Sequence, residues 1–306
     1  MRHLFSVAAI GAAIVAALAV GVGSSHATYP GSTDGRIALA VDVDATGLHS
    51  DIVTMLPNGR AVRRLTDDPG GEICPAYSAD GKEITFCSDA SGSFEIWTMK
   101  QNGEQQTQVT NLGLRSLFPD FSPDGERIVF MSGTFANFDI YVVDRGSGAV
   151  TQLTSSPGLD GFPVYSPDGS KIAFVSARSG LPQVWVMNAD GTNPVQLTTD
   201  PAPKGQLPDW SPDGTQIAYQ SMATGGGDIY VMNADGSNSR RLTFAAELEF
   251  GPTWSPEGDQ IAFTRQLGPG VLDRVVFVAN VDGSGEYALA DAARVPGWQP
   301  RGDRIG

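Results

Sequence analysis

Few residues in this sequence have the types and spacing that catalysis requires. Beyond residue 27 the chain contains one histidine, His49, so a metal cluster of several histidines is excluded and at most one imidazole could serve a Ser-His-Asp system. The sequence contains no Gly-x-Ser-x-Gly nucleophile turn, no phosphate-binding loop and no Cys-x-x-Cys. His49 lies in the loop 43–50, and we interpret it as an exposed loop residue. We therefore predict no catalytic residue.

Two acidic residues near this histidine could contribute to a cation site. Asp42 and Asp44 alternate at the end of an expected strand. Calcium takes six or more oxygen ligands, which could include carbonyls of the loop. Two carboxylates are few for such a site, and solvated loop acids are the favoured interpretation. We expect no cofactor and no metal site, with calcium at this loop as the alternative.

The only two cysteines, Cys74 and Cys87, flank a turn whose midpoint falls between Asp80 and Gly81. A loop of even length would place them opposite each other on two paired strands, where an oxidising compartment would allow a disulfide. A bulge at the glycine of the turn would shift this register by one residue. We predict the disulfide, with two buried free thiols as the alternative.

These residues are positioned by an internal repeat of 44 or 45 residues. Each copy contains an aromatic residue, the turn Ser-Pro-Asp-Gly or a close variant, and a short apolar run. A period of this length indicates a repeat architecture. The inner strands of the copies are expected to start near Pro75, Pro119, Pro163, Pro208, Pro252 and Pro296.

One repeat contains four expected strands. Proline and glycine favour a tight turn between the first two strands, and a third and a short fourth strand follow, as in 228–230 and 241–243. Four antiparallel strands per repeat are typical of a β-propeller blade. The aromatic residue of each copy is expected to pack in the core between blades rather than to form a sugar-binding platform. These aromatics are Tyr77, Phe121, Tyr165, Trp210, Trp254 and Trp298.

The two ends of the array predict how the ring closes. Three strands near 36–41, 51–55 and 62–65 precede the first full copy, and one inner-strand sequence around Trp298 follows the last. Three strands and one strand make a blade shared by both termini, which leaves no open sheet edge. We predict an all-β fold, a six-bladed β-propeller of four-stranded antiparallel blades, in a single domain over 28–306. A monomer is expected.

Residues 1–27 are typical of a secretory signal peptide, with a basic start, an apolar run and small residues before the cut. An uncleaved membrane anchor is the alternative, because the apolar run is long. Either way the remaining chain is expected outside the cytoplasm, in the periplasm or the extracellular space, without a membrane span after cleavage. The net charge of −14 and the lack of a Lys/Arg cluster exclude nucleic-acid binding.

The internal copies distinguish two faces of the expected disc. The Ser-Pro-Asp-Gly and Asn-Ala-Asp-Gly turns, which define the constant-turn face, are nearly identical between copies. The opposite loops differ between copies and define the variable-loop face. Loops that need not match one another can be shaped around a ligand. These loops are 67–73, 111–117, 155–161, 199–206, 244–250 and 291–294. Candidate binding residues at the channel rim are Glu72, Arg115, Asp160, Lys204, Glu249 and Arg294.

The repeated aromatic-Ser-Pro-Asp-Gly, Ile-Tyr-Val-Met-Asn-Ala-Asp-Gly and Arg-Leu-Thr segments resemble the TolB-type, WD40-like propeller repeat, most clearly in 210–243. The resemblance covers about residues 33–305 and implies extracytoplasmic protein binding, as in the Tol–Pal envelope system. It covers the propeller only, and we expect no counterpart of the α/β domain that precedes the propeller in TolB.

Two functions therefore remain open. The first is a binding module for an envelope or extracellular protein or a surface polymer. The second is a propeller hydrolase or lyase acting on a carbohydrate or lactone, with a metal in the channel.

Overall fold

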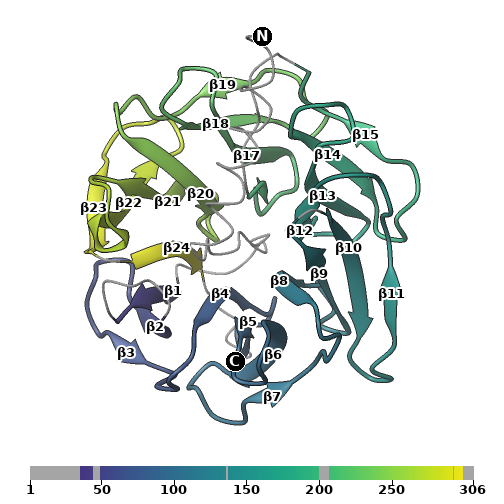
Figure 1. The fold of residues 1–306 in the computed structure, drawn as a ribbon. Coiled ribbons are helices and arrows are strands. Elements are labelled where there is room, and N and C mark those ends of the chain that lie inside the picture. Colours follow the sequence, from purple (N-terminus) through teal and green to yellow (C-terminus); the bar gives the residue numbers. More distant parts are fainter. Residues whose placement is uncertain (1–34, 44–48, 136, 200–206, 292, 299–306) are drawn as a thin grey trace, which may run out of the picture.

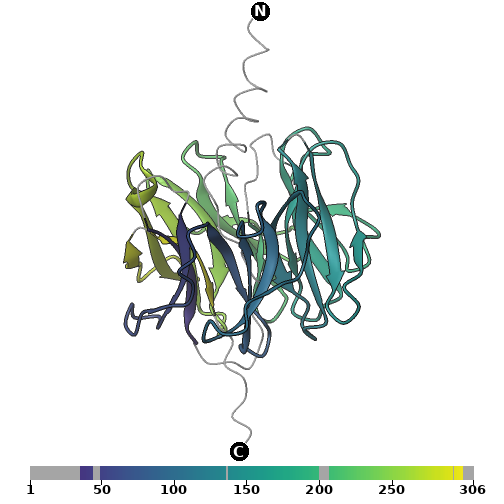
Figure 2. The same cartoon turned by 60° about the horizontal axis from the view of Figure 1, so that its bottom comes forward.

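A ring of β-sheets surrounds a central axis (Figure 1). The computed structural model describes residues 35–43, 49–135, 137–199, 207–291 and 293–298. Within these residues six antiparallel sheets of four strands make up the ring, and one short 3-10 helix, η1 (Val271–Asp273), interrupts the β-structure. From the side the ring is a disc whose strands run between its two faces (Figure 2). The predicted all-β, six-bladed propeller is confirmed.

The first two strands of each blade form the hairpin that the Ser-Pro-Asp-Gly turn predicts. Blades 1 to 5 follow in chain order, and the sixth is called the closing blade. The inner strands are β4 (Glu72–Tyr77), β8 (Arg115–Phe121), β12 (Asp160–Tyr165), β16 (Asp209–Trp210), β20 (Leu248–Trp254) and, in the closing blade, β24 (Ala293–Trp298). The second strands are β5 (Glu83–Ser88), β9 (Arg127–Thr134), β13 (Lys171–Ser176), β17 (Gln216–Ser221), β21 (Gln260–Gln266) and, in the closing blade, β1 (Ile37–Asp42).

The outer half of each blade is a longer third strand and a short fourth strand. The third strands are β6 (Glu95–Lys100), β10 (Asn137–Asp144), β14 (Gln183–Asn188), β18 (Asp228–Asn233), β22 (Arg274–Asn280) and, in the closing blade, β2 (Ser50–Met55). The fourth strands are β7 (Thr107–Gln108), β11 (Val150–Gln152), β15 (Val195–Gln196), β19 (Arg240–Arg241), β23 (Tyr287–Asp291) and, in the closing blade, β3 (Arg63–Arg64).

The closing blade joins the two ends of the chain. Its strand order is β24-β1-β2-β3, so the last strand of the described chain becomes the inner partner of the first. In the register of this pair Ile37 lies opposite Trp298 and Val41 opposite Ala293. The predicted sharing of the sixth blade by both termini is confirmed.

The acids of the constant-turn face shape their own turns. In blade 3 the Ser166 hydroxyl donates to Asp168 Oδ1 at 2.6 Å, and the Ser170 amide donates to the same oxygen at 3.0 Å. The Lys171 amide closes the turn on Ser166 Oγ at 3.0 Å. These hydrogen bonds hold the pKa of Asp168 below its usual value. The repeated acids are therefore turn residues, as the sequence predicts.

The inner-strand aromatics pack between the blades, as expected. Tyr77, Phe121, Tyr165, Trp210 and Trp254 are each at most 3% exposed. The side chain of Trp298 lies outside the described residues, although its backbone belongs to β24. The aromatic position is therefore a core position in the five blades where it can be assessed.

The inner strands of blades 1, 2, 3 and 5 also contain a bulge that the repeat pattern did not predict. The residue before the inner-strand proline has a positive φ in blades 1 to 5, and the pairing register shifts around it in blades 1, 2, 3 and 5. Four of these residues are not glycine, so the left-handed backbone is a strained conformation that the packing of the ring maintains. The five residues are Cys74, Phe118, Phe162, Leu207 and Gly251.

Candidate functional site

The variable-loop face is held by a repeated clamp between the third and fourth strands. In blade 1 the Thr110 hydroxyl donates to Glu95 Oε2 at 2.6 Å and accepts the Ile96 amide at 2.9 Å. Glu95 Oε1 also accepts the amides of Leu112 and Gly113, at 2.8 and 2.9 Å. The threonine that ends the Val109-Thr110 pair and the acid that starts the third strand thus fix the loop that leads to the next blade.

Three of the six predicted rim residues occupy one equivalent position in their blades. Glu72, Asp160 and Glu249 each lie three residues before the inner-strand proline, and each is at most 1% exposed. Arg115 lies one residue earlier in its repeat and is half-buried. Lys204 lies outside the described residues. Arg294 is placed by its backbone opposite Ala40, and its side chain is outside the description.

Two of the three equivalent acids hold an arginine of their own blade. Arg178 Nη2 lies 2.8 Å from Asp160 Oδ2, and its guanidinium stacks over Phe174 and Trp185. In blade 5 the Arg265 Nε donates to Glu249 Oε1 at 2.7 Å. A buried carboxylate is costly unless a cation neutralises it, so these pairs belong to the structure of their blades.

Arg265 makes the more extensive of the two networks. Its two terminal nitrogens also donate to both oxygens of Glu286 at 2.7 Å, and its guanidinium lies 4.2 Å from the centre of the Phe277 ring. Burial raises the pKa of Glu249, while Arg265 acts in the opposite direction. The guanidinium therefore neutralises two carboxylates at once.

Glu72 has no such cation. Its Oε1 accepts the Ser88 hydroxyl at 3.1 Å, and its Oε2 has no hydrogen-bond partner among the described residues. The pKa of Glu72 is raised to about 7, mainly by burial and also by the nearby acids Asp68, Asp51 and Asp89, while the Ser88 hydrogen bond acts in the opposite direction. Glu72 is thus the one acid of the three that lacks a guanidinium within its own blade.

Exposed apolar side chains gather on the variable-loop face. The loops between the second and third strands of each antiparallel blade open on the same face as the variable loops. Of the eleven large apolar residues exposed in the described chain, eight lie in loops or strand ends of this face. They are Val43, Leu112, Leu114, Phe135, Phe244, Leu248, Leu267 and Leu272. The other three, on the opposite side, are Val62, Val195 and Tyr287. The variable-loop face is therefore the more apolar of the two faces among the described residues.

Arginine–aromatic stacks lie within this apolar surface. The guanidinium of Arg115 lies over the rings of Phe94 and Phe135, at 5.1 and 4.8 Å from their centres. Arg241 lies 4.7 Å from the centre of the Phe244 ring, which is 73% exposed. Sequence reasoning selected Arg115 by its charge and missed the phenylalanines. The signal for them was their place in loops that differ between repeats.

The predicted disulfide pair lies in the core of blade 1. Cys87 pairs in register with Ile73 rather than with Cys74, so the expectation of direct opposition is wrong by one residue. The bulge at Cys74, where φ is 58°, is the cause. Both side chains are buried thiols in the structure, and burial together with the neighbouring Cys74 raises the pKa of the Cys87 thiol. The disulfide stays a prediction.

This disulfide can be tested on exported protein. We expect protein alkylated without reductant to keep its unmodified mass, because an oxidising compartment favours the bond between two adjacent sulfurs. Intact-mass spectrometry after alkylation of the denatured chain measures this. Two alkyl groups on protein recovered from that compartment would show two free thiols instead.

The other residues considered for catalysis or calcium binding, His49, Asp42 and Asp44, are not seen to form a site among the described residues. His49 is exposed and its carbonyl accepts the Val43 amide at 3.0 Å. Asp42 is buried, whereas Asp44, its expected calcium partner, lies outside the described residues. Among the described residues no group of three His, Cys, Asp or Glu side chains is arranged around a metal position. Residues 1–27 are outside the description, and in the part described no helix is long and apolar enough to cross a membrane.

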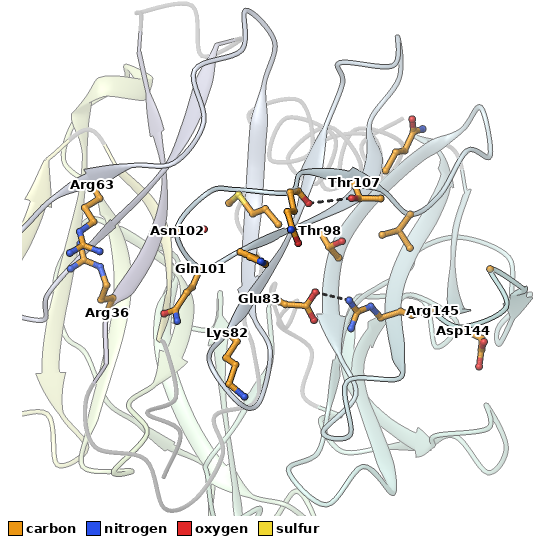
Figure 3. A pocket seen from close by; sticks show the side chains of 16 residues that line it. Arg36, Arg63, Lys82, Glu83, Thr98, Gln101, Asn102, Thr107, Asp144 and Arg145 are labelled. Carbon is orange, nitrogen blue, oxygen red and sulfur yellow. Dashed lines mark hydrogen bonds and ion pairs between the residues drawn. The ribbon is translucent and has the colours of Figure 1, made fainter. Parts of the chain in front are cut away.

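A pocket of about 930 Å³ lies on the constant-turn face, beside the turns of the closing blade, blade 1 and blade 2 (Figure 3). Several of its cations are already bonded within the protein. Arg145 lies 2.8 Å from Glu83 Oε1, and Lys82 lies 2.9 Å from Asp80 Oδ2. Arg36 donates to the Thr54 hydroxyl and carbonyl. We assign this pocket no role in the candidate site.

Comparisons with known proteins agree with this architecture. A family model described as the TolB beta propeller domain matches residues 105–204 and 184–305, which together make up more than half of the chain. TolB from Acinetobacter baumannii is 24% identical, with a TM-score of 0.77 over 89% of this chain and 68% of that one.

More distant structures share the fold alone. A nidogen–laminin complex is 13% identical, with a TM-score of 0.69 over 87% of this chain and 98% of that one. An oligogalacturonate lyase in complex with manganese is 16% identical, with a TM-score of 0.52 over 85% and 74%. No curated protein sequence matches. The family match and the six repeated blades lead to one conclusion, that this chain belongs to the TolB β-propeller domain family.

Proposed function

We propose that this chain is an exported, non-catalytic propeller that binds an envelope or extracellular protein through its variable-loop face. The observation that carries this proposal is the gathering of exposed apolar side chains on that face. Burying Phe135 and Phe244 against a partner would remove apolar area from water, which is the main favourable term in protein association. The opposite face offers fewer such groups.

The composition of the face also fits a protein partner. Aromatic residues and arginine supply most of the energy of protein interfaces, and Arg115 with Phe94 and Phe135 combines both. Membership of the TolB propeller family supports extracytoplasmic binding of a protein. The acidic chain, with a net charge of −14, favours partners with basic groups. A surface polymer is the other ligand to test.

Replacing both exposed phenylalanines is expected to reduce partner capture. The double variant Phe135→Ala, Phe244→Ala should bind at least about 30-fold more weakly, which corresponds to the loss of about 2 kcal/mol that one aromatic hot-spot residue causes. The matched control is Val62→Ala, Val195→Ala, which removes residues of similar exposure from the opposite side. Quantitative mass spectrometry of envelope proteins captured by each variant measures the effect, with thermal melting to confirm folding.

Equal capture by the double variant and the wild type would remove this face from the proposal. Loss of capture in the control alone would assign binding to the constant-turn face. Turnover of oligogalacturonates or lactones by the purified protein, with calcium or manganese added, would instead establish the enzymatic alternative.

A further inference from the structure

The repeat provides an internal comparison for the buried acid Glu72. Glu72 and Asp160 start their inner strands at the same repeat position, and each faces the serine opposite, Ser88 and Ser176. The aromatic pair beneath Arg178 also has a counterpart. Phe86 pairs in register with Trp97 in blade 1, as Phe174 pairs with Trp185 in blade 3.

The loops that follow the second strands have the same backbone geometry. The Ala90 amide donates to Ser88 Oγ at 3.2 Å, and the Arg178 amide donates to Ser176 Oγ at the same distance. Ala90 therefore occupies the position from which Arg178 reaches Asp160. Blade 1 keeps the acid and both aromatic residues but has a methyl group where blade 3 has a guanidinium.

The surroundings of Glu72 are acidic. Asp51 lies on the neighbouring strand of the closing blade, Asp68 lies in the preceding loop and Asp89 in the following one. Asp51 is bonded to Arg64 at 2.7 Å, and Asp89 Oδ1 accepts the Gly71 amide at 2.9 Å. Glu72 itself is 0% exposed and its Oε2 lacks a hydrogen-bond partner among the described residues. Glu72 and the half-buried Trp97 thus occupy the repeat positions that, in blade 3, Arg178 contacts together as Asp160 and Trp185.

We propose that Glu72, Phe86 and Trp97 form a receptor for an arginine side chain of the partner protein, in the place that Arg178 fills within blade 3. This inference rests on the proposed function and names the chemistry of the partner. A guanidinium suits the position better than an ammonium, because it can bond to a carboxylate while its plane stacks on an aromatic ring. Because Glu72 is enclosed, the arriving side chain enters past the exposed Ala90 and moves Asp89 aside.

The test uses the full chain and two probe peptides, acetyl-Gly-Arg-Gly amide and the same peptide with citrulline. Citrulline has nearly the shape of arginine without its charge. We expect the arginine peptide to shift the Trp97 indole N–H resonance in a saturable way, and the citrulline peptide to bind at least tenfold more weakly. An equal shift by both peptides would overturn the proposal.

Two variants and one control test the same position. Glu72→Gln removes the charge and should abolish the shift, and Ala90→Arg should fill the receptor from within and block the peptide. Ala223→Arg is the matched control, since Ala223 makes the same amide bond to Ser221 in blade 4. It should bind like the wild type. Binding retained by Glu72→Gln, or by Ala90→Arg, would contradict the assignment.

Partner capture distinguishes this inference from the proposed function. If Ala90→Arg captures envelope proteins as the wild type does while Phe135→Ala, Phe244→Ala does not, the binding face stands and the arginine receptor is wrong. If capture falls at least tenfold in Ala90→Arg and not in Ala223→Arg, both are supported. If neither Ala90→Arg nor the double variant Phe135→Ala, Phe244→Ala changes capture, the proposed function fails. The peptide titration then decides whether Glu72 binds an arginine side chain.

Discussion

A chain that lacks residues 293–306 is expected to be largely unfolded at temperatures where the complete chain is folded. The deletion removes β24, which supplies the inner strand of the closing blade and packs against β20, β22 and β4. Ile37, Ala38 and Leu39 of β1 are 0% exposed and would face water along an unpaired edge. We expect a loss of about 5 kcal/mol or more, against a typical total stability of about 5–15 kcal/mol.

The matched control deletes residues 299–306 only. This shorter deletion keeps the whole register between β24 and β1, which ends at Trp298. Its midpoint of thermal unfolding should lie within a few degrees of that of the complete chain. Circular dichroism melts of the three proteins measure both effects. If the longer deletion also melts within a few degrees, the closing blade contributes little and the ring is stable while open.

The second large effect is expected from Arg265→Met. Methionine keeps much of the packing on Phe263 and Phe277 but leaves Glu249 and Glu286 without a cation. Removing one partner of a buried ion pair typically costs about 3–5 kcal/mol, because the other charge stays buried. Urea unfolding at neutral pH measures the loss.

A double-mutant cycle separates the charge from the packing. Glu249→Gln combined with Arg265→Met should be less destabilised than the sum of the two single variants, by about 1–3 kcal/mol, because a neutral amide no longer requires the guanidinium. Arg178→Met should cost less, since Arg178 is 19% exposed and bonds to one carboxylate. A loss below about 1 kcal/mol in Arg265→Met would mean that the stack, not the ion pair, stabilises blade 5.

The parts of the fold that repeat were predictable from the sequence. The period, the turn residues and the three-plus-one arrangement at the ends fix the number of blades and the closure, because each copy satisfies the same local geometry. The turn acids, such as Asp168, were predictable for the same reason. The division into two faces followed from comparing loops within the chain.

The parts that break the repeat were not predictable. The bulge at Cys74 moved the cysteines out of direct opposition, and no turn residue marks it. The partners of the rim acids depend on long side chains, since Arg178 reaches back to Asp160 across the sheet and Arg265 reaches Glu286. Strand periodicity gives the face on which a side chain lies but not the distance it spans. The sequence therefore placed Glu72, Asp160 and Glu249 correctly along the chain and missed that two are neutralised.

The closing blade also determines the order in which the ring can assemble. Blades 1 to 5 pair strands that are neighbours in the chain, whereas Ile37 and Trp298 are separated by 261 residues. Bringing such distant residues together costs about 5 kcal/mol of chain entropy in the simple loop-closure relation, so this pairing is expected to be late. Until residue 298 has been synthesised, β1 presents an open edge. A second chain could supply its own β24 to that edge, and two rings that exchange this strand would form a swapped dimer.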